Sequence, residues 1–115
     1  MSGVELIAEE RKRQVESEGW TAEHDDQHSN QQLAWAAVCY AAPSEVKAKV
    51  IPPDADCGCR SVGECMHWLG EPRWGDPWPW DVDWDKRQKH DRIRQLQIAG
   101  ALMAAEIDRL QRKSA

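Results

Sequence analysis

The apolar residues between positions 93 and 110 constrain the fold of this chain more than any other feature. They recur at steps of three and four residues: Ile93, Leu96, Gly100, Met103, Ile107 and Leu110. This spacing puts them on one face of a helix, where they would pack against a core or a partner helix. Gly100 and Ala104 also form a small-xxx-small face that would suit an alanine-rich neighbouring helix. The pattern predicts a long C-terminal helix.

Two further helices are predicted upstream. Residues 3–18 carry apolar residues at helical spacing, with Ser2 and Glu5 as a capping box and Gly19 as a natural stop. Residues 33–41 form an alanine-rich helix that follows a second capping box of the S-x-x-Q kind at residues 29–32 and ends before Pro43. A short helical piece is expected over residues 44–50. Three packed helices place the chain in the all-α class.

The composition fits a single small domain, residues 1–115, with one modest core. Residues 52–84 form a long irregular segment rich in Pro, Gly, Asp, Cys and Trp, and so long a loop is usually functional or held by something other than a core. The mean hydropathy is −0.77, no apolar run reaches ~18 residues, and the start lacks a secretory pattern. We therefore expect a cytoplasmic protein without a membrane partner.

The charge balance bears on the choice of partner. The net charge is −5 and the isoelectric point is about 5.3, whereas proteins that bind duplex nucleic acid need a clustered basic surface. Duplex nucleic acid is therefore not expected as a partner.

Three cysteines and one histidine in the irregular segment form a potential zinc site. The ligands would be Cys57, Cys59, Cys65 and His67. A closed set of four protein ligands is typical of structural Zn²⁺, which would staple the loop. The alternative is a flexible loop with free thiols. Cys39, on the alanine-rich helix, is expected to be a small buried residue and not a ligand.

The acidic stretch after the first helix has two interpretations. It contains His24, Asp25, Asp26 and His28. These side chains could bind a ligand or a divalent cation, or the Asp residues could serve the start of the next helix. With Glu9 and Glu10 the stretch resembles the all-α nucleotide pyrophosphohydrolases, which bind Mg²⁺ through helix carboxylates, although Arg13 stands where their E-x-x-E pattern has its second Glu.

The segment before the last helix combines tryptophans with basic residues. Trp74, Trp78, Trp80 and Trp84 precede Lys86, Arg87, Arg92 and Arg94. Aromatic faces beside guanidinium groups suit a flat anionic ligand such as a nucleotide. Alternatively, a chain with seven Trp and no Phe simply fills its core with Trp.

Several short segments of the sequence resemble known proteins. "EERKRQVESEGWTAEHDDQH", "LAWAAVCYA", "WPWDVDW" and "DRIRQLQIAGALMAAEIDRL" resemble small uncharacterised proteins of bacteriophages and prophages, over residues 5–42 and 77–110. A fainter likeness is to the Ry domain found in ryanodine receptors and in some bacterial and phage proteins. The shared motifs are Gly19-Trp20, His28, Pro79-Trp80-Asp81 and Asp91-Arg92. This likeness favours a nucleotide-like ligand.

The resemblance implies an accessory protein acting in the cytoplasm of the bacterial host. We expect a non-catalytic binder of a nucleotide-derived small molecule that sequesters a host immune signal. Trp20, Trp78 and Trp80 would stack on the base, Arg92 and Arg94 would hold phosphate, and His24, Asp25 and Asp26 would accept hydrogen bonds from ribose or amine groups. His28 and Asp81 complete the expected site.

Two other functions stay open. The acidic surface and exposed Trp residues would suit an inhibitor or adaptor that binds a host defence protein. A metal-dependent nucleotide hydrolase would use Glu9, Glu10, Asp25 and Asp26, but no nucleophile with an adjacent base and no glycine-rich phosphate loop supports an enzyme. The stripe between residues 93 and 110 slightly favours a homo-oligomer.

Overall fold

The computed structural model describes residues 1–28, 31–50 and 73–114, and it confirms the all-α class. Its helices are α1 (Gly3–Glu16), α2 (Ala22–Asp26), α3 (Gln32–Ala41) and α4 (Arg92–Ser114), with 3-10 turns η1 (Val82–Trp84) and η2 (Arg87–Lys89). The three predicted helices correspond to α1, α3 and α4. The short helix α2 lies within the acidic stretch.

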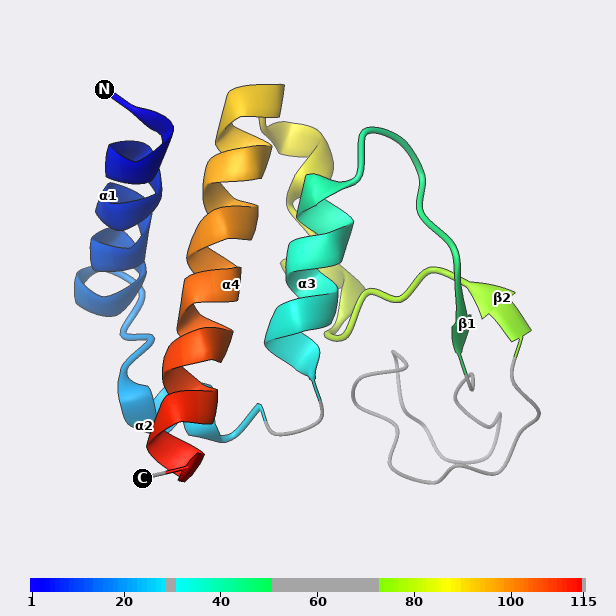
Figure 1. Ribbon diagram of the computed structural model, residues 1–115. Helices are drawn as coiled ribbons and strands as arrows, with labels where there is room; N and C mark the ends of the chain where they lie inside the picture. Colours follow the sequence, from blue (N-terminus) through cyan, green and yellow to red (C-terminus); the bar gives the residue numbers. More distant parts are fainter. Residues whose placement is uncertain (29–30, 51–72, 115) are drawn as a thin grey trace.

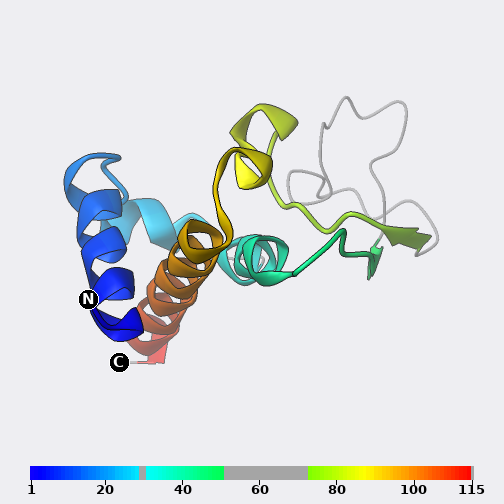
Figure 2. The ribbon, with the colours of Figure 1, turned by 90° about the horizontal axis from the view of Figure 1, so that it is seen from above.

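Helix α4 lies between α1 and α3, so that the three long helices stand side by side in one layer (Figure 1). Seen from above, α2 and the segment that leads from β2 to α4 lie on the same side of this layer (Figure 2). Segments from both halves of the chain therefore meet over one face of α3 and α4. No described helix is long and apolar enough to cross a membrane.

Helix α1 begins and ends near the residues that the sequence signals indicate. The capping box is formed: Ser2 Oγ accepts from the Glu5 backbone N–H, and the Glu5 carboxylate accepts from the Ser2 backbone N–H. The helix ends at Glu16, two residues earlier than expected, and Gly19 adopts φ 72°. This left-handed backbone, which glycine accommodates without a side-chain clash, turns the chain so that Trp20 N–H donates to Gln14 C=O at 2.9 Å.

Two local predictions between residues 29 and 50 were wrong. Helix α3 does not use the S-x-x-Q box, because its N-cap is Gln31, whose backbone is left-handed with φ 66° and whose side chain makes no capping bond. The expected helical piece over 44–50 contains strand β1 (Ala48–Val50) instead, antiparallel to β2 (Arg73–Gly75), with Lys49 opposite Trp74. Hydrogen bonding to a segment distant in sequence thus overrides the local helical preference.

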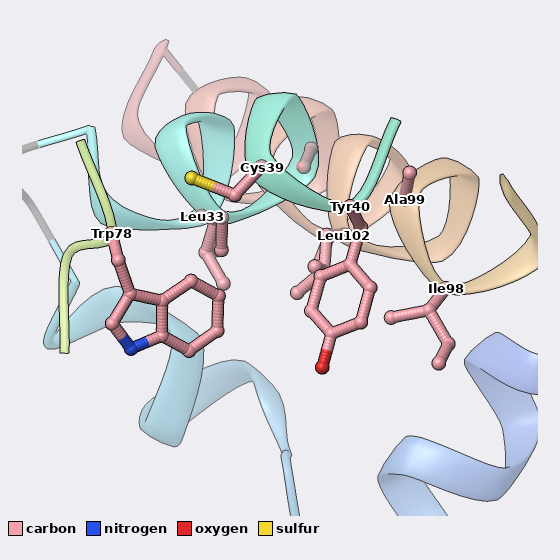
Figure 3. Close-up of a cluster of buried hydrophobic side chains, with 10 residues drawn as sticks. Leu33, Cys39, Tyr40, Trp78, Ile98, Ala99 and Leu102 are labelled. Atoms are coloured by element: carbon pink, nitrogen blue, oxygen red, sulfur yellow. The ribbon is translucent and has the colours of Figure 1, made fainter. Parts of the chain in front are cut away.

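The core lies between α3 and α4 and is closed by one tryptophan (Figure 3). Helix α4 contributes small or medium side chains, and Trp78 covers them with only 5% of its own surface exposed. The alternative prediction, that tryptophan fills the core, is therefore confirmed for Trp78. The buried apolar residues are Leu33, Ala36, Ala37, Cys39, Tyr40, Trp78, Ile98, Ala99, Ala101, Leu102 and Ala105.

The predicted stripe on α4 does not face this core. Its large side chains, Ile93, Leu96, Met103, Ile107 and Leu110, are exposed. Gly100 does not pack against the alanines of α3, because a Cβ built at Gly100 would lie 2.5 Å from Cδ1 of Ile7 on α1. The glycine is therefore where α1 approaches α4 closely, and the stripe and the core occupy different faces of the same helix.

Candidate functional site

A pocket of about 240 Å³ lies on the face where α2 and the Trp78–Trp84 segment meet α3 and α4. Its walls are mainly aromatic and aliphatic, as in most small-molecule sites. The lining residues are Trp20, His24, His28, Leu33, Tyr40, Trp78, Trp80, Asp81, Trp84, Ile98 and Leu102. Six of the ten residues predicted to bind a ligand are therefore brought together around one cavity.

Aromatic rings from distant parts of the chain form a continuous series along this pocket. Trp20 stacks on His24 with centroids 5.6 Å apart and planes 2° from parallel, and His24 meets His28 edge-on at 5.0 Å. His28 then contacts Trp80 at 5.2 Å, and Trp80 contacts Trp78 edge-on at 5.5 Å. The acidic stretch and the Pro-Trp segment thus contact each other directly at the pocket wall.

The Trp78–Asp81 segment is fixed by hydrogen bonds at both ends. The Asp76 carboxylate accepts from the Trp78 backbone N–H at 2.9 Å, and the Trp78 indole N–H donates to Asp81 C=O at 3.1 Å. The Arg87 guanidinium lies 5.3 Å from the Trp78 ring centroid, a cation–π contact. Because these contacts hold the backbone, the pocket wall is preformed.

The indole N–H of Trp80 stands out among the polar groups of this segment. It is buried, and it has no hydrogen-bond partner among the residues that the structure describes. A buried donor without an acceptor costs about 1–3 kcal/mol. The Trp80 side chain is also part of the pocket wall.

Asp25 acts within the protein and not on the pocket. Its carboxylate is completely buried, 2.8 Å from Arg11 Nη2 and 3.1 Å from His24 Nδ1. A carboxylate beside Nδ1 favours the tautomer with the proton there, which leaves Nε2 as the acceptor. Asp26 also lies away from the pocket and pairs with Arg112 at 2.8 Å. The ligand contacts expected of Asp25 and Asp26 are replaced by these ion pairs.

The electrostatics of His28 favour a neutral ring. Burial lowers its pKa, and the nearby His24 lowers it further, against the opposing effect of Asp25. A neutral imidazole offers one donor and one acceptor. His28 is therefore suited to hydrogen bonding with an uncharged group.

The two arginines expected to hold phosphate are occupied elsewhere. Arg92 donates to the backbone carbonyls of Ala41 and Ala42, which extends the C-terminal end of α3. Arg94 lies 2.8 Å from the buried Glu10 carboxylate and joins α4 to α1. Neither lines the pocket, so that expectation is corrected. Among the described residues, the Asp81 carboxylate is the only acidic group in the wall, and no Lys or Arg lines it.

The predicted metal sites find no support among the described residues. Cys57, Cys59, Cys65 and His67 lie outside the described ranges. Within residues 1–28, 31–50 and 73–114, no group of three or more His, Cys, Asp or Glu side chains is placed to hold a metal. Cys39 is buried, as expected, and burial raises the pKa of its thiol to about 12.

The carboxylates proposed for a hydrolase are used in packing. Glu10 is buried and accepts from both Arg13 and Arg94. Burial raises the pKa of Glu10, but the hydrogen bonds from the two arginines outweigh it and lower the pKa below the usual value. Glu9 is exposed. Together with the ion pair of Asp25, this arrangement joins the helices and does not form a metal site.

Four pocket residues were missed by the sequence interpretation: Leu33, Tyr40, Ile98 and Leu102. Their positions carry a signal only after the fold is known, because Leu33 and Tyr40 are seven residues apart on α3 and Ile98 and Leu102 are four apart on α4. Each pair therefore lies on one face of its helix. Trp84, which also lines the pocket, belonged to the predicted aromatic group but not to the ten expected contacts.

Comparison with known proteins returned no matching family model, no matching curated protein and no matching solved structure.

Proposed function

We propose that the protein binds a nucleotide-derived small molecule without catalysis and holds its base in the aromatic pocket. The observation that carries the proposal is the meeting of Trp20, Trp78 and Trp80, from two distant segments, around one cavity. Flat aromatic walls favour a flat ring by stacking, which contributes about 1–3 kcal/mol per base.

The polar groups favour the base end of such a ligand over its phosphates. Trp80 N–H would donate to a ring nitrogen or carbonyl, and the neutral His28 would donate or accept. The Asp81 carboxylate, which accepts from the Asp83 backbone N–H at 2.9 Å, would repel a phosphate. At about 240 Å³, below the usual range for whole ligands of roughly 300–1,000 Å³, the cavity suits one ring system, with ribose and phosphate directed to solvent.

The resemblance to small phage proteins suggests which ligands to test first. A protein that binds a nucleotide signal without turning it over would sequester the signal from its receptor. Cyclic nucleotides, cyclic dinucleotides and ADP-ribose derivatives are therefore the first panel, with the free nucleosides as the minimal ligands.

Isothermal titration calorimetry with this panel tests the proposal. Trp80→Phe keeps an aromatic ring but removes the N–H, and it should weaken binding roughly tenfold, the value of one hydrogen bond. Trp35→Phe is the matched control, because Trp35 lies on α3 outside the pocket lining and should leave affinity unchanged. The ligand should be recovered intact after incubation with Mg²⁺. Absence of binding across the panel, or turnover, would refute the proposal.

A further inference from the structure

The large side chains of α4 point away from the fold to which the helix belongs. We call Ile93, Leu96, Met103, Ile107 and Leu110 the outer stripe. Each exposes between 42% and 69% of its surface. The face turned to the core carries two alanines, Ala99 and Ala105, beside Ile98 and Leu102. A helix that is apolar on both faces requires a partner on each of them.

The outer stripe has the geometry of a coiled-coil seam. Its residues follow the steps of three and four that define the a and d positions of a heptad repeat. The position between Leu96 and Met103 is Gly100, which contacts Ile7 of α1 at the edge of the stripe. The repeat extends over residues 93–110, a length of roughly 26 Å at 1.5 Å per residue. A helix with a similar repeat packs well against such a seam, and a second copy of this chain supplies one.

A hollow at the end of the stripe has the form that this packing needs. It is lined by Ile107, Leu110, Gln111 and Ser114, at positions i, i+3, i+4 and i+7 of α4. Four residues in this arrangement form the hole that receives one side chain of a facing helix in knobs-into-holes packing.

The exposed apolar area supplies a large part of what a homodimer needs. A fully buried Leu, Ile or Met contributes about 1.5–3 kcal/mol at about 25 cal/mol per Å², which corresponds to roughly 60–120 Å². With the exposed fractions of its five residues, the outer stripe presents about 160–310 Å² of apolar surface per chain. A standard interface buries about 800 Å² per partner, and homodimer interfaces are about 65% apolar, which corresponds to about 500 Å². The stripe alone supplies about a third to three fifths of this apolar part.

We propose that the outer stripe of α4 is a homodimer interface, in which α4 packs against α4 of a second copy about a twofold axis. Ile98 and Leu102 line the pocket from the opposite face of the same helix. The dimer therefore leaves both pockets accessible and presents two equivalent sites. This inference does not depend on the identity of the ligand.

Light scattering coupled to size exclusion tests the proposal on the full chain. The wild type should have twice the 13.1 kDa mass of one chain over a wide range of concentrations. Ile107→Glu, and separately Met103→Glu, should halve this mass while the helical circular dichroism is retained. Val82→Glu is the control, since Val82 is 60% exposed, close to the 56% of Ile107, but lies in η1, outside the stripe.

The control protein should remain dimeric. A wild type with the mass of a single chain at every concentration would overturn the proposal whatever the variants do. Dimers that persist in both Ile107→Glu and Met103→Glu would overturn it as well, because the interface would then lie elsewhere.

Discussion

Asp25→Asn should destabilise the protein strongly, although it keeps the shape of the side chain. The Asp25 side chain has no solvent exposure, and its carboxylate lies 2.8 Å from Arg11 and 3.1 Å from His24. The variant removes the negative charge from this buried site. It leaves the Arg11 guanidinium, whose Nη1 has no partner within the described part of the chain. Breaking a buried ion pair on one side costs about 3–5 kcal/mol.

The lower end of that range applies here. The Arg11 side chain is 18% exposed, so water relieves part of its loss, and we expect about 3 kcal/mol in the free energy of unfolding. For a chain of this size, about 4 °C per kcal/mol gives a fall in Tm of roughly 12 °C. Urea denaturation followed by circular dichroism measures the first quantity, and a thermal scan measures the second.

The neighbouring residue provides the control. Asp26 pairs with Arg112 at the same distance, 2.8 Å, but this pair is exposed, so Asp26→Asn should cost at most about 1 kcal/mol. If the two variants lose the same amount of stability, or if Asp25→Asn loses less than Asp26→Asn, the assignment of Asp25 to a buried structural pair is wrong.

The remaining predictions concern three other side chains. The lowered pKa of His28 means that the unfolded chain takes up its proton at a higher pH than the folded one. Stability from His28 should therefore be complete above the ordinary His pKa of about 6.5 and fall as the pH decreases through it, and His28→Asn should flatten this fall in urea titrations at pH 5 and 8. Cys39 is buried, with a thiol pKa of about 12. It should resist iodoacetamide in the native protein and react in urea, as read by peptide mass spectrometry, and rapid native labelling would contradict its placement in the core. Gly100→Ala should lower stability despite the better helix propensity of alanine, which is worth about 1 kcal/mol, because the added Cβ meets both Cδ1 and Cγ1 of Ile7 within 2.7 Å. The double variant Gly100→Ala with Ile7→Val should be less affected in the same denaturation assay, and a stabilised single variant would contradict the close approach of the two helices.

The sequence was a good guide where the signal is local. The Ser2–Glu5 capping box and the Gly19 stop depend on neighbouring residues, and both are present. The start of α3 depends on the left-handed backbone of Gln31. The strand over Ala48–Val50 depends on pairing with residues 73–75. Neither a single left-handed residue nor a distant pairing partner leaves a periodic pattern in the chain, and both features were predicted incorrectly.

The candidate site shows the same division. Residue type identified Trp20, His24, His28, Trp78, Trp80 and Asp81, which line one pocket. It also assigned Arg92 and Arg94 to phosphate, because composition shows that guanidinium groups are present but not which acceptors already hold them. The Ala41 and Ala42 carbonyls and the Glu10 carboxylate occupy these arginines, and only tertiary structure shows this.

The orientation of α4 was left open by its sequence for a related reason. The stripe at Ile93, Leu96, Met103, Ile107 and Leu110 is more apolar than the alanine-containing face, and periodicity favours the larger residues as the core. In the fold, Trp78 and Tyr40 fill the space over α4, so that small residues fit beneath them. Volume complementarity between distant segments decided which face is buried.

The central claim is that the aromatic pocket holds a base through the Trp80 indole. Nitrogen-15 NMR of the indole N–H groups during titration with the best ligand of the panel tests it most directly, with Trp80→Phe used to assign the signal. The account predicts that the Trp80 N–H resonance moves downfield as the donor gains an acceptor, while that of Trp35 does not move. A ligand that binds with the Trp80 resonance unchanged would contradict it.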